Sequence, residues 1–96
     1  DPAPNKAILF RMLDNLKRIF WPNKQWEEAK GCIERQLLLY PAPELSIQLG
    51  NVAEMQGNRE LAEYTYAQIR ENTDVEKIRE LASKRLLAMA SSNKMH

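Results

Sequence analysis

The chain has 96 residues and a mass of 11.2 kDa, a length that fits one domain. Its 14 Lys and Arg against 13 Asp and Glu leave a net charge of +1, which gives no electrostatic reason to bind nucleic acid or an acidic membrane. A single cysteine and a single histidine exclude an internal disulfide and the usual zinc modules, so neither a metal nor another cofactor is expected.

The first predicted element is a helix over residues 6–21. Its apolar residues recur every three or four positions, which is typical of a helix with one buried face. We expect the following residues to face the core: Leu9, Leu13, Leu16 and Phe20. Pro22 disfavours a longer helix because it lacks an N–H and restricts the residue before it.

Four more helices are predicted, over residues 24–40, 44–56, 59–71 and 75–90. Pro41 and Pro43 separate the second from the third, and Gly57-Asn58 reads as a helix stop followed by an N-cap. The second and third are expected to turn these residues inward: Trp26, Ala29, Ile33, Leu37, Tyr40, Leu45, Leu49, Val52 and Ala53. The fourth and fifth are expected to bury these: Leu61, Ala62, Tyr66, Ile69, Val75, Ile78, Ala82, Leu86 and Met89. No segment alternates with the period of a strand.

The helices repeat at a fixed spacing. Leu16 returns as Leu49, Ala29 as Ala62, and Ile33 as Tyr66; these three pairs keep their places within their helices. The period is about 33, and a period near 34 with small residues at fixed points is the tetratricopeptide signature. Lys17 stands where the second unit has Gly50, and we expect either looser packing there or an outward-pointing lysine stem.

This pattern predicts an all-α fold, a right-handed helical solenoid of two tetratricopeptide-like pairs closed by a C-terminal capping helix. We expect one such domain over residues 1–96. The outer face of the capping helix would be polar, since an end unit must face water. A generic antiparallel bundle of five helices, with the spacing a coincidence, is the alternative.

The first part of the sequence, as far as Pro41, resembles a more specific family. Asn5-Lys6, the run from Arg11 to Lys17, Trp26 and the string from Glu34 to Pro41 occur in the order found in the C-terminal tail of SirB-type transglutaminase-like proteins. The resemblance implies a helical accessory region that follows a papain-like catalytic part. Because the sequence opens on Asp1 rather than Met, we expect a processed product or a piece of a longer protein.

Cys32 is the one residue that could act as a nucleophile, and it would need a histidine to hold its thiolate. His96 is the only histidine, in a tail expected to fray, so we interpret Cys32 as a small packing residue. Without a catalytic constellation, the chain by itself is not expected to be an enzyme. Trp21 points away from the predicted stripe and either rests on Pro22 or serves as an exposed anchor for a partner.

The resemblance to tetratricopeptide arrays implies that the first, third and fifth helices line a concave groove. The groove residues would be Arg11, Asp14, Asn15, Arg18, Gln48, Asn51, Met55, Lys77 and Lys84. Arginines and lysines there favour a peptide or protein partner that carries acidic groups.

The favoured function is therefore a non-catalytic protein-protein interaction module, an accessory or scaffold region. The alternative is a regulatory or substrate-binding tail of a larger transglutaminase- or papain-like enzyme. Self-association through an open end of the solenoid is a third hypothesis. No apolar run approaches the roughly 20 residues of a membrane span, so we expect a cytoplasmic protein, or one inside an organelle if a transit peptide was removed.

Overall fold

A computed structural model describes the backbone of residues 5–94 and the side chains as far as residue 91. The described chain is all-helical, as predicted. The helices are α1 (Asn5–Phe20), α2 (Trp26–Leu39), α3 (Pro43–Met55), α4 (Arg59–Asn72) and α5 (Glu76–Lys94). Apart from the end of α5, each boundary lies within two residues of its predicted place, because prolines and Gly57 mark the turns.

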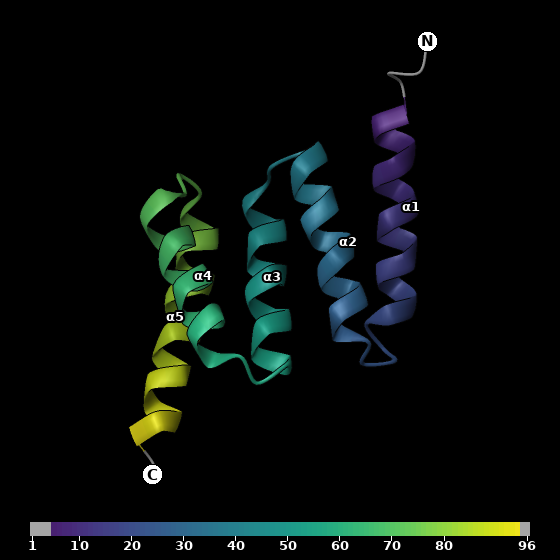
Figure 1. The fold of residues 1–96 in the computed structure, drawn as a ribbon. Coiled ribbons are helices and arrows are strands. Elements are labelled where there is room, and N and C mark those ends of the chain that lie inside the picture. The colour runs from purple at the N-terminus through teal and green to yellow at the C-terminus, as the bar shows by residue number, and fades with distance from the viewer. Residues whose placement is uncertain (1–4, 95–96) are drawn as a thin grey trace.

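Consecutive helices run antiparallel, and α1, α2 and α3 stand in a row that ends in α4 and α5 (Figure 1). Helix α3 is central, because it packs directly on α2, α4 and α5. The Cα atoms extend over 55 × 32 × 17 Å. The molecule is thus a flat row of helices with α1 at one end.

The spacing of the sequence repeat recurs in the backbone geometry. Helix α4 begins and ends at this spacing from the two ends of α2, and α5 begins at the same spacing from the start of α3. The turns before α2 and α4 also match. Lys24 and Gly57 have φ values of 59° and 77°, and Gln25 and Asn58 follow with nearly identical φ and ψ angles. The repeat seen in the sequence is therefore also a repeat of local structure.

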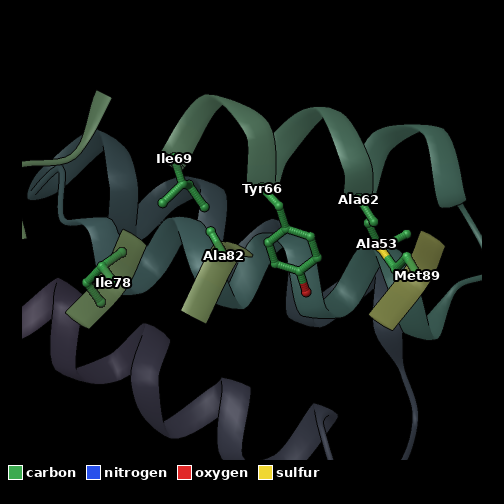
Figure 2. Packing of buried hydrophobic residues seen from close by; sticks show 7 residues of the cluster. All are labelled: Ala53, Ala62, Tyr66, Ile69, Ile78, Ala82 and Met89. Atoms are coloured by element: carbon green, nitrogen blue, oxygen red, sulfur yellow. The ribbon is translucent and has the colours of Figure 1, made fainter. Parts of the chain in front are cut away.

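Two clusters of buried side chains hold the row together. One joins α3, α4 and α5 and consists of Ala53, Ala62, Tyr66, Ile69, Ile78, Ala82 and Met89 (Figure 2). The other joins α2 and α3 through Ile33, Leu45 and Val52, with partly buried Phe10 and Trp21 packed against it. Since α3 contributes to both clusters, they form a continuous core along the row.

Helices α3 and α4 approach each other closely at Gly50. A Cβ atom at this position would lie 2.5 Å from Cε1 of Tyr66, a distance that side chains do not tolerate. The Tyr66 ring is fully buried against the glycine, and its hydroxyl donates a hydrogen bond to Oδ1 of Asn51 at 2.6 Å. Gly50 is therefore required by the close approach rather than by its backbone angles.

The predicted orientation of α1 is wrong. Leu9 and Leu16 are 47% and 41% exposed, whereas Lys17 is only 7% exposed. Successive residues of a helix point about 100° apart, so turning Lys17 inward rotates the aliphatic stripe away from the core. Lys17 does not point outward as expected, because amide side chains of α2 and α3 supply acceptors for its ammonium group.

Two further predicted core residues are exposed. Tyr40 is 45% exposed at the end of α2, and Val75 is 43% exposed just before α5 begins. Tyr40 packs edge-to-face against Phe10, with ring centroids 5.6 Å apart, and Lys6 lies over the tyrosine ring. Both residues lie where a helix meets a turn, so helical periodicity does not fix their direction.

Candidate functional site

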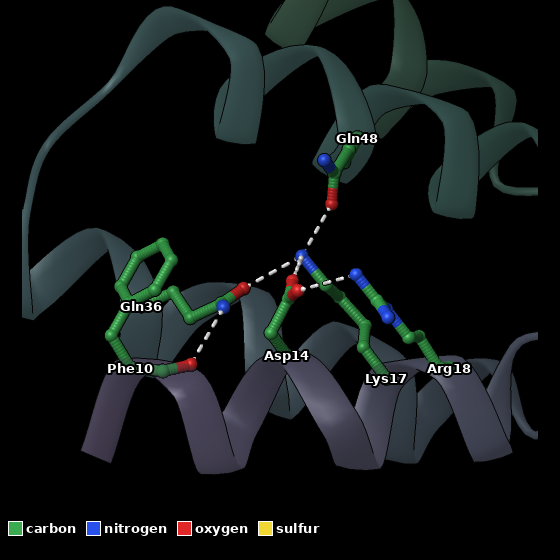
Figure 3. A network of polar contacts seen from close by, with 6 residues as sticks. All are labelled: Phe10, Asp14, Lys17, Arg18, Gln36 and Gln48. Carbon is green, nitrogen blue, oxygen red and sulfur yellow. Dashed lines mark hydrogen bonds and ion pairs between the residues drawn. The ribbon is translucent and has the colours of Figure 1, made fainter. Parts of the chain in front are cut away.

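The predicted groove faces of α1 and α3 meet at Lys17. Its Nζ atom donates hydrogen bonds to Oε1 of Gln36 at 2.7 Å and to Oε1 of Gln48 at 2.6 Å (Figure 3). Gln36 belongs to α2 and Gln48 to α3, so one ammonium group links three helices. This contact places Gln48 beside α1, as the groove hypothesis requires.

Asp14 and Arg18 surround the same ammonium group. Asp14 lies 3.4 Å from Lys17 Nζ and 3.4 Å from Nη2 of Arg18. The Asp14 side chain is 36% exposed and that of Arg18 is 77% exposed, so the network runs from the interior to solvent. Gln36 donates its amide N–H to the carbonyl of Phe10 at 3.3 Å. No buried side-chain nitrogen or oxygen among the described residues lacks a partner.

A second polar link joins α3 to α5. Nε and Nη2 of Arg85 donate to the two carboxylate oxygens of Glu54 at 3.0 and 2.6 Å. The hydrogen bond from Arg85 lowers the pKa of the Glu54 carboxyl. Burial, followed by the neighbouring Glu54, raises the pKa of Tyr66 in the same region. The carboxylate is thus engaged in holding two helices together.

The predicted groove residues fall into two groups. Arg11, Asn15, Arg18, Met55, Lys77 and Lys84 are exposed. Asp14, Gln48 and Asn51 are half-buried, and their side-chain oxygens already interact within the chain. The exposed group is free to meet a partner, whereas the half-buried group shapes the floor beneath it.

Sequence reasoning missed the two residues that connect these helices. Lys17 was expected to pack loosely or point outward, and Arg85 was assigned only to the water-facing side of the capping helix. The signal for Lys17 was its alignment with Gly50, because a long side chain at a close-packed position needs specific partners. Arg85 gave no such signal, since its pairing with Glu54 depends on how α5 packs against α3.

Trp21 is partly buried rather than an exposed anchor. It packs against the cluster of Ile33, Leu45 and Val52, and its ring meets that of Trp26 edge-to-face at 5.5 Å and 89°. Such aromatic pairs stabilise packing beyond simple burial. Trp21 therefore closes the turn between α1 and α2, and only its remaining exposed edge can contact a partner.

Cys32 is buried in α2, as the packing interpretation predicted. Burial raises the pKa of its thiol, which disfavours the nucleophilic thiolate. His96 lies outside the described residues. Within the described part of the chain, no group of three or more His, Cys, Asp or Glu side chains could hold a metal ion.

The structure also reveals a groove that the sequence did not predict. It has a volume of about 460 Å³ and lies between α2 and α4, over the start of α3. Leu37, Leu49 and Tyr64 contribute apolar walls, and Gln68 and Asn72 contribute amide groups. No charged residue is among its lining side chains, so it is suited to neutral rather than acidic groups.

Within residues 5–94, no helix combines the length and the apolar character needed to cross a membrane.

Comparison with known proteins gives one short match. A segment of 41 residues is 39% identical to part of a UPF0162 protein from Xylella fastidiosa (strain 9a5c), and it covers 43% of this chain and 15% of that relative. No protein-family model and no solved structure matches the chain.

Proposed function

We propose that the chain is a non-catalytic protein-interaction module of the tetratricopeptide type. In this proposal the pairs α1–α2 and α3–α4 form two units of a right-handed solenoid, and α5 caps the second. The recurrence of helix bounds and turn angles at the spacing of the sequence repeat supports it. The exposed side chains of α1, α3 and α5 line the concave groove in which a peptide or protein surface binds.

The hydrogen bond between Lys17 and Gln48 carries this proposal. It joins residues 31 positions apart and brings the polar face of α1 against that of α3. The pair of Glu54 and Arg85 does the same for α3 and α5. A surface built from three alternate helices can hold an extended segment along its length, whereas separate helix faces could not.

The charges of α1 favour acidic groups in the partner. Arg11 and Arg18 are exposed and two helical turns apart, so they lie on the same side of the helix. Asp14 is already drawn toward Lys17 and Arg18, which leaves the face with a positive excess. Arginine holds carboxylates through two parallel hydrogen bonds, and the resulting contact is specific as well as attractive.

The test uses peptides selected on the immobilised chain from a random displayed library. We expect the selected peptides to carry acidic residues and the double variant Arg11→Glu, Arg18→Glu to bind them more weakly by about 1–3 kcal/mol, with a smaller effect at high salt. Its melting temperature should hardly change, because exposed charges contribute little to stability. The double variant Arg35→Glu, Arg70→Glu, which reverses two exposed arginines on α2 and α4, is the matched control. Equal binding by a folded Arg11, Arg18 variant would remove the groove from the proposal.

A narrower form of the proposal makes the chain the regulatory or substrate-binding tail of a larger transglutaminase- or papain-like enzyme. Its support is the resemblance of the sequence as far as Pro41 to the tail of SirB-type proteins, together with a match that covers only 15% of a longer relative. The parent reading frame tests it directly. A cysteine with a downstream histidine encoded before Asp1 would support the enzyme tail, and a parent without them would leave only the interaction module.

A further inference from the structure

The side of α1 that faces away from the other helices is aliphatic. We call it the α1 outer stripe, and it consists of Ile8, Leu9, Met12, Leu16 and Ile19. These side chains are 41 to 58% exposed. Helix α1 stands at one end of the row, and no described helix lies beyond it (Figure 1). A contiguous exposed apolar surface on a small domain is typical of an interaction site.

The internal repeat shows what kind of element covers such a stripe. At the repeat spacing, Met12, Leu16 and Ile19 correspond to Leu45, Leu49 and Val52 on α3. Leu45 and Val52 are buried in one cluster with Ile33 of α2, and Leu49 and Leu37 pack against it. On α3, therefore, these positions are covered by the aliphatic face of the preceding helix, whereas on α1 the described chain supplies no such cover.

The charges beside the stripe favour an acidic occupant. Arg11 and Arg18 directly precede Met12 and Ile19, about 100° around the helix, and both are exposed. Asp14 is the only acidic residue of α1, and it already pairs with Lys17 and Arg18. Two copies of α1 packed together would bring these arginines close to one another, so charge disfavours a second copy of the chain as the occupant.

We propose that the α1 outer stripe is the docking site for one amphipathic helix of a partner protein. That helix presents an aliphatic face of the kind that α2 presents to α3, with acidic residues on the flank that meets Arg11 and Arg18. It occupies the place relative to α1 that α2 occupies relative to α3. This site lies at the end of the row and does not depend on the groove proposed above.

The test titrates the ¹⁵N-labelled chain with a capped peptide that copies residues 24–40 and carries Cys32→Ser. This peptide contains the face that covers α3, and NMR detects binding even when it is weak. We expect saturable shifts of backbone amides between residues 8 and 19, which decline as salt concentration rises. The double variant Met12→Asp, Ile19→Asp should lower the affinity at least about tenfold, since two aliphatic contacts are lost.

A matched control separates this effect from a general loss of apolar surface. Leu38→Asp with Leu87→Asp changes two leucines that are 84% and 69% exposed on α2 and α5, and it should leave the affinity unchanged. Melting curves show whether both double variants remain folded, as expected for substitutions at exposed positions. Because the variant at Met12 and Ile19 leaves Arg11 and Arg18 in place, its result is separate from the test of the groove.

Several results would overturn the proposal. One is the absence of shifts at millimolar peptide, and another is a set of shifts confined to the groove between α2 and α4. A dimer in sedimentation that the Met12, Ile19 variant abolishes would assign the stripe to a second copy. Binding to vesicles of neutral and anionic phospholipid that requires the stripe, without peptide binding, would assign it to a membrane surface.

Discussion

Position 17 and its counterpart Gly50 have opposite requirements. In the second unit the Tyr66 ring fills the space beside residue 50, and no Cβ atom fits there. In the first unit Ile33 replaces the tyrosine, which leaves room for the stem of Lys17. Gln36 stands where the second unit has Ile69 and supplies an acceptor for the ammonium group. A buried lysine and a buried glycine thus solve the same packing position with different neighbours.

Lys17→Met tests the polar half of this arrangement. Methionine keeps the length of the stem but leaves the amide oxygens of Gln36 and Gln48 without their donor. We expect a loss of about 1–3 kcal/mol in the free energy of unfolding, measured by chemical denaturation. Lys77→Met, at an exposed position of α5, is the control and should change stability little. A Lys17 variant as stable as the control would show that the network contributes nothing.

Gly50→Ala tests the steric half. The added Cβ atom meets the Tyr66 ring, so we expect a cost of about 1–3 kcal/mol in the free energy of unfolding. The same substitution should cost less in a Tyr66→Ile background, which restores the pairing found in the first unit. Gly31→Ala is the matched control, because its nearest neighbour is the flexible guanidinium of Arg35 and alanine favours the helix. Equal costs in both backgrounds would contradict the account.

At the scale of elements, α5 is fastened to α3 by a charged pair as well as by apolar packing. The two hydrogen bonds between Arg85 and Glu54 join residues 31 positions apart, and α3 and α5 also make direct contact. Both partners are partly exposed, so the pair fixes the orientation of α5 more than it adds to stability.

The pair gives stability a defined dependence on pH. Because Arg85 lowers the pKa of folded Glu54 below its ordinary value of 4.5, the stabilisation is complete above that value and is lost as pH falls through the lowered pKa. We expect the stability difference between the wild type and Glu54→Gln to shrink as the pH is lowered from 7 to 3 in a series of thermal melts. Glu80→Gln, at an exposed site on α5, controls for the lost charge. A difference that stays constant over this range would contradict the assignment.

The sequence predicted the helices well because the breaks between them are chemical. Pro41, Pro43 and Gly57 enforce turns wherever they occur, and small residues such as Ala29 and Ala62 are buried as the repeat predicted. The orientation of α1 could not be obtained in this way. Its apolar residues cover a wide arc, and the helices that pack on it, rather than periodicity, decide which part of the arc is buried. The groove between α2 and α4 depends on the same tertiary packing, so no local motif predicted it.

At the scale of the whole molecule, α3 decides how the row is organised. It contributes to both apolar clusters, and it receives polar contacts from Lys17 on one side and Arg85 on the other. The proposed groove depends on this central position, because its residues come from α1, α3 and α5. The α1 outer stripe depends on the opposite property, the lack of a described helix beyond the end of the row.

The measurement that tests this account most directly is a nuclear Overhauser effect between the side chains of Lys17 and Gln48. Their polar atoms are 2.6 Å apart, so protons on the neighbouring methylene groups lie close enough to give a cross-peak in a side-chain-labelled sample. We expect that cross-peak, together with slow exchange of the Lys17 ammonium protons. If Lys17 instead shows only contacts within α1 and rapid exchange with water, α1 and α3 do not meet, and the groove that carries the proposed function does not form.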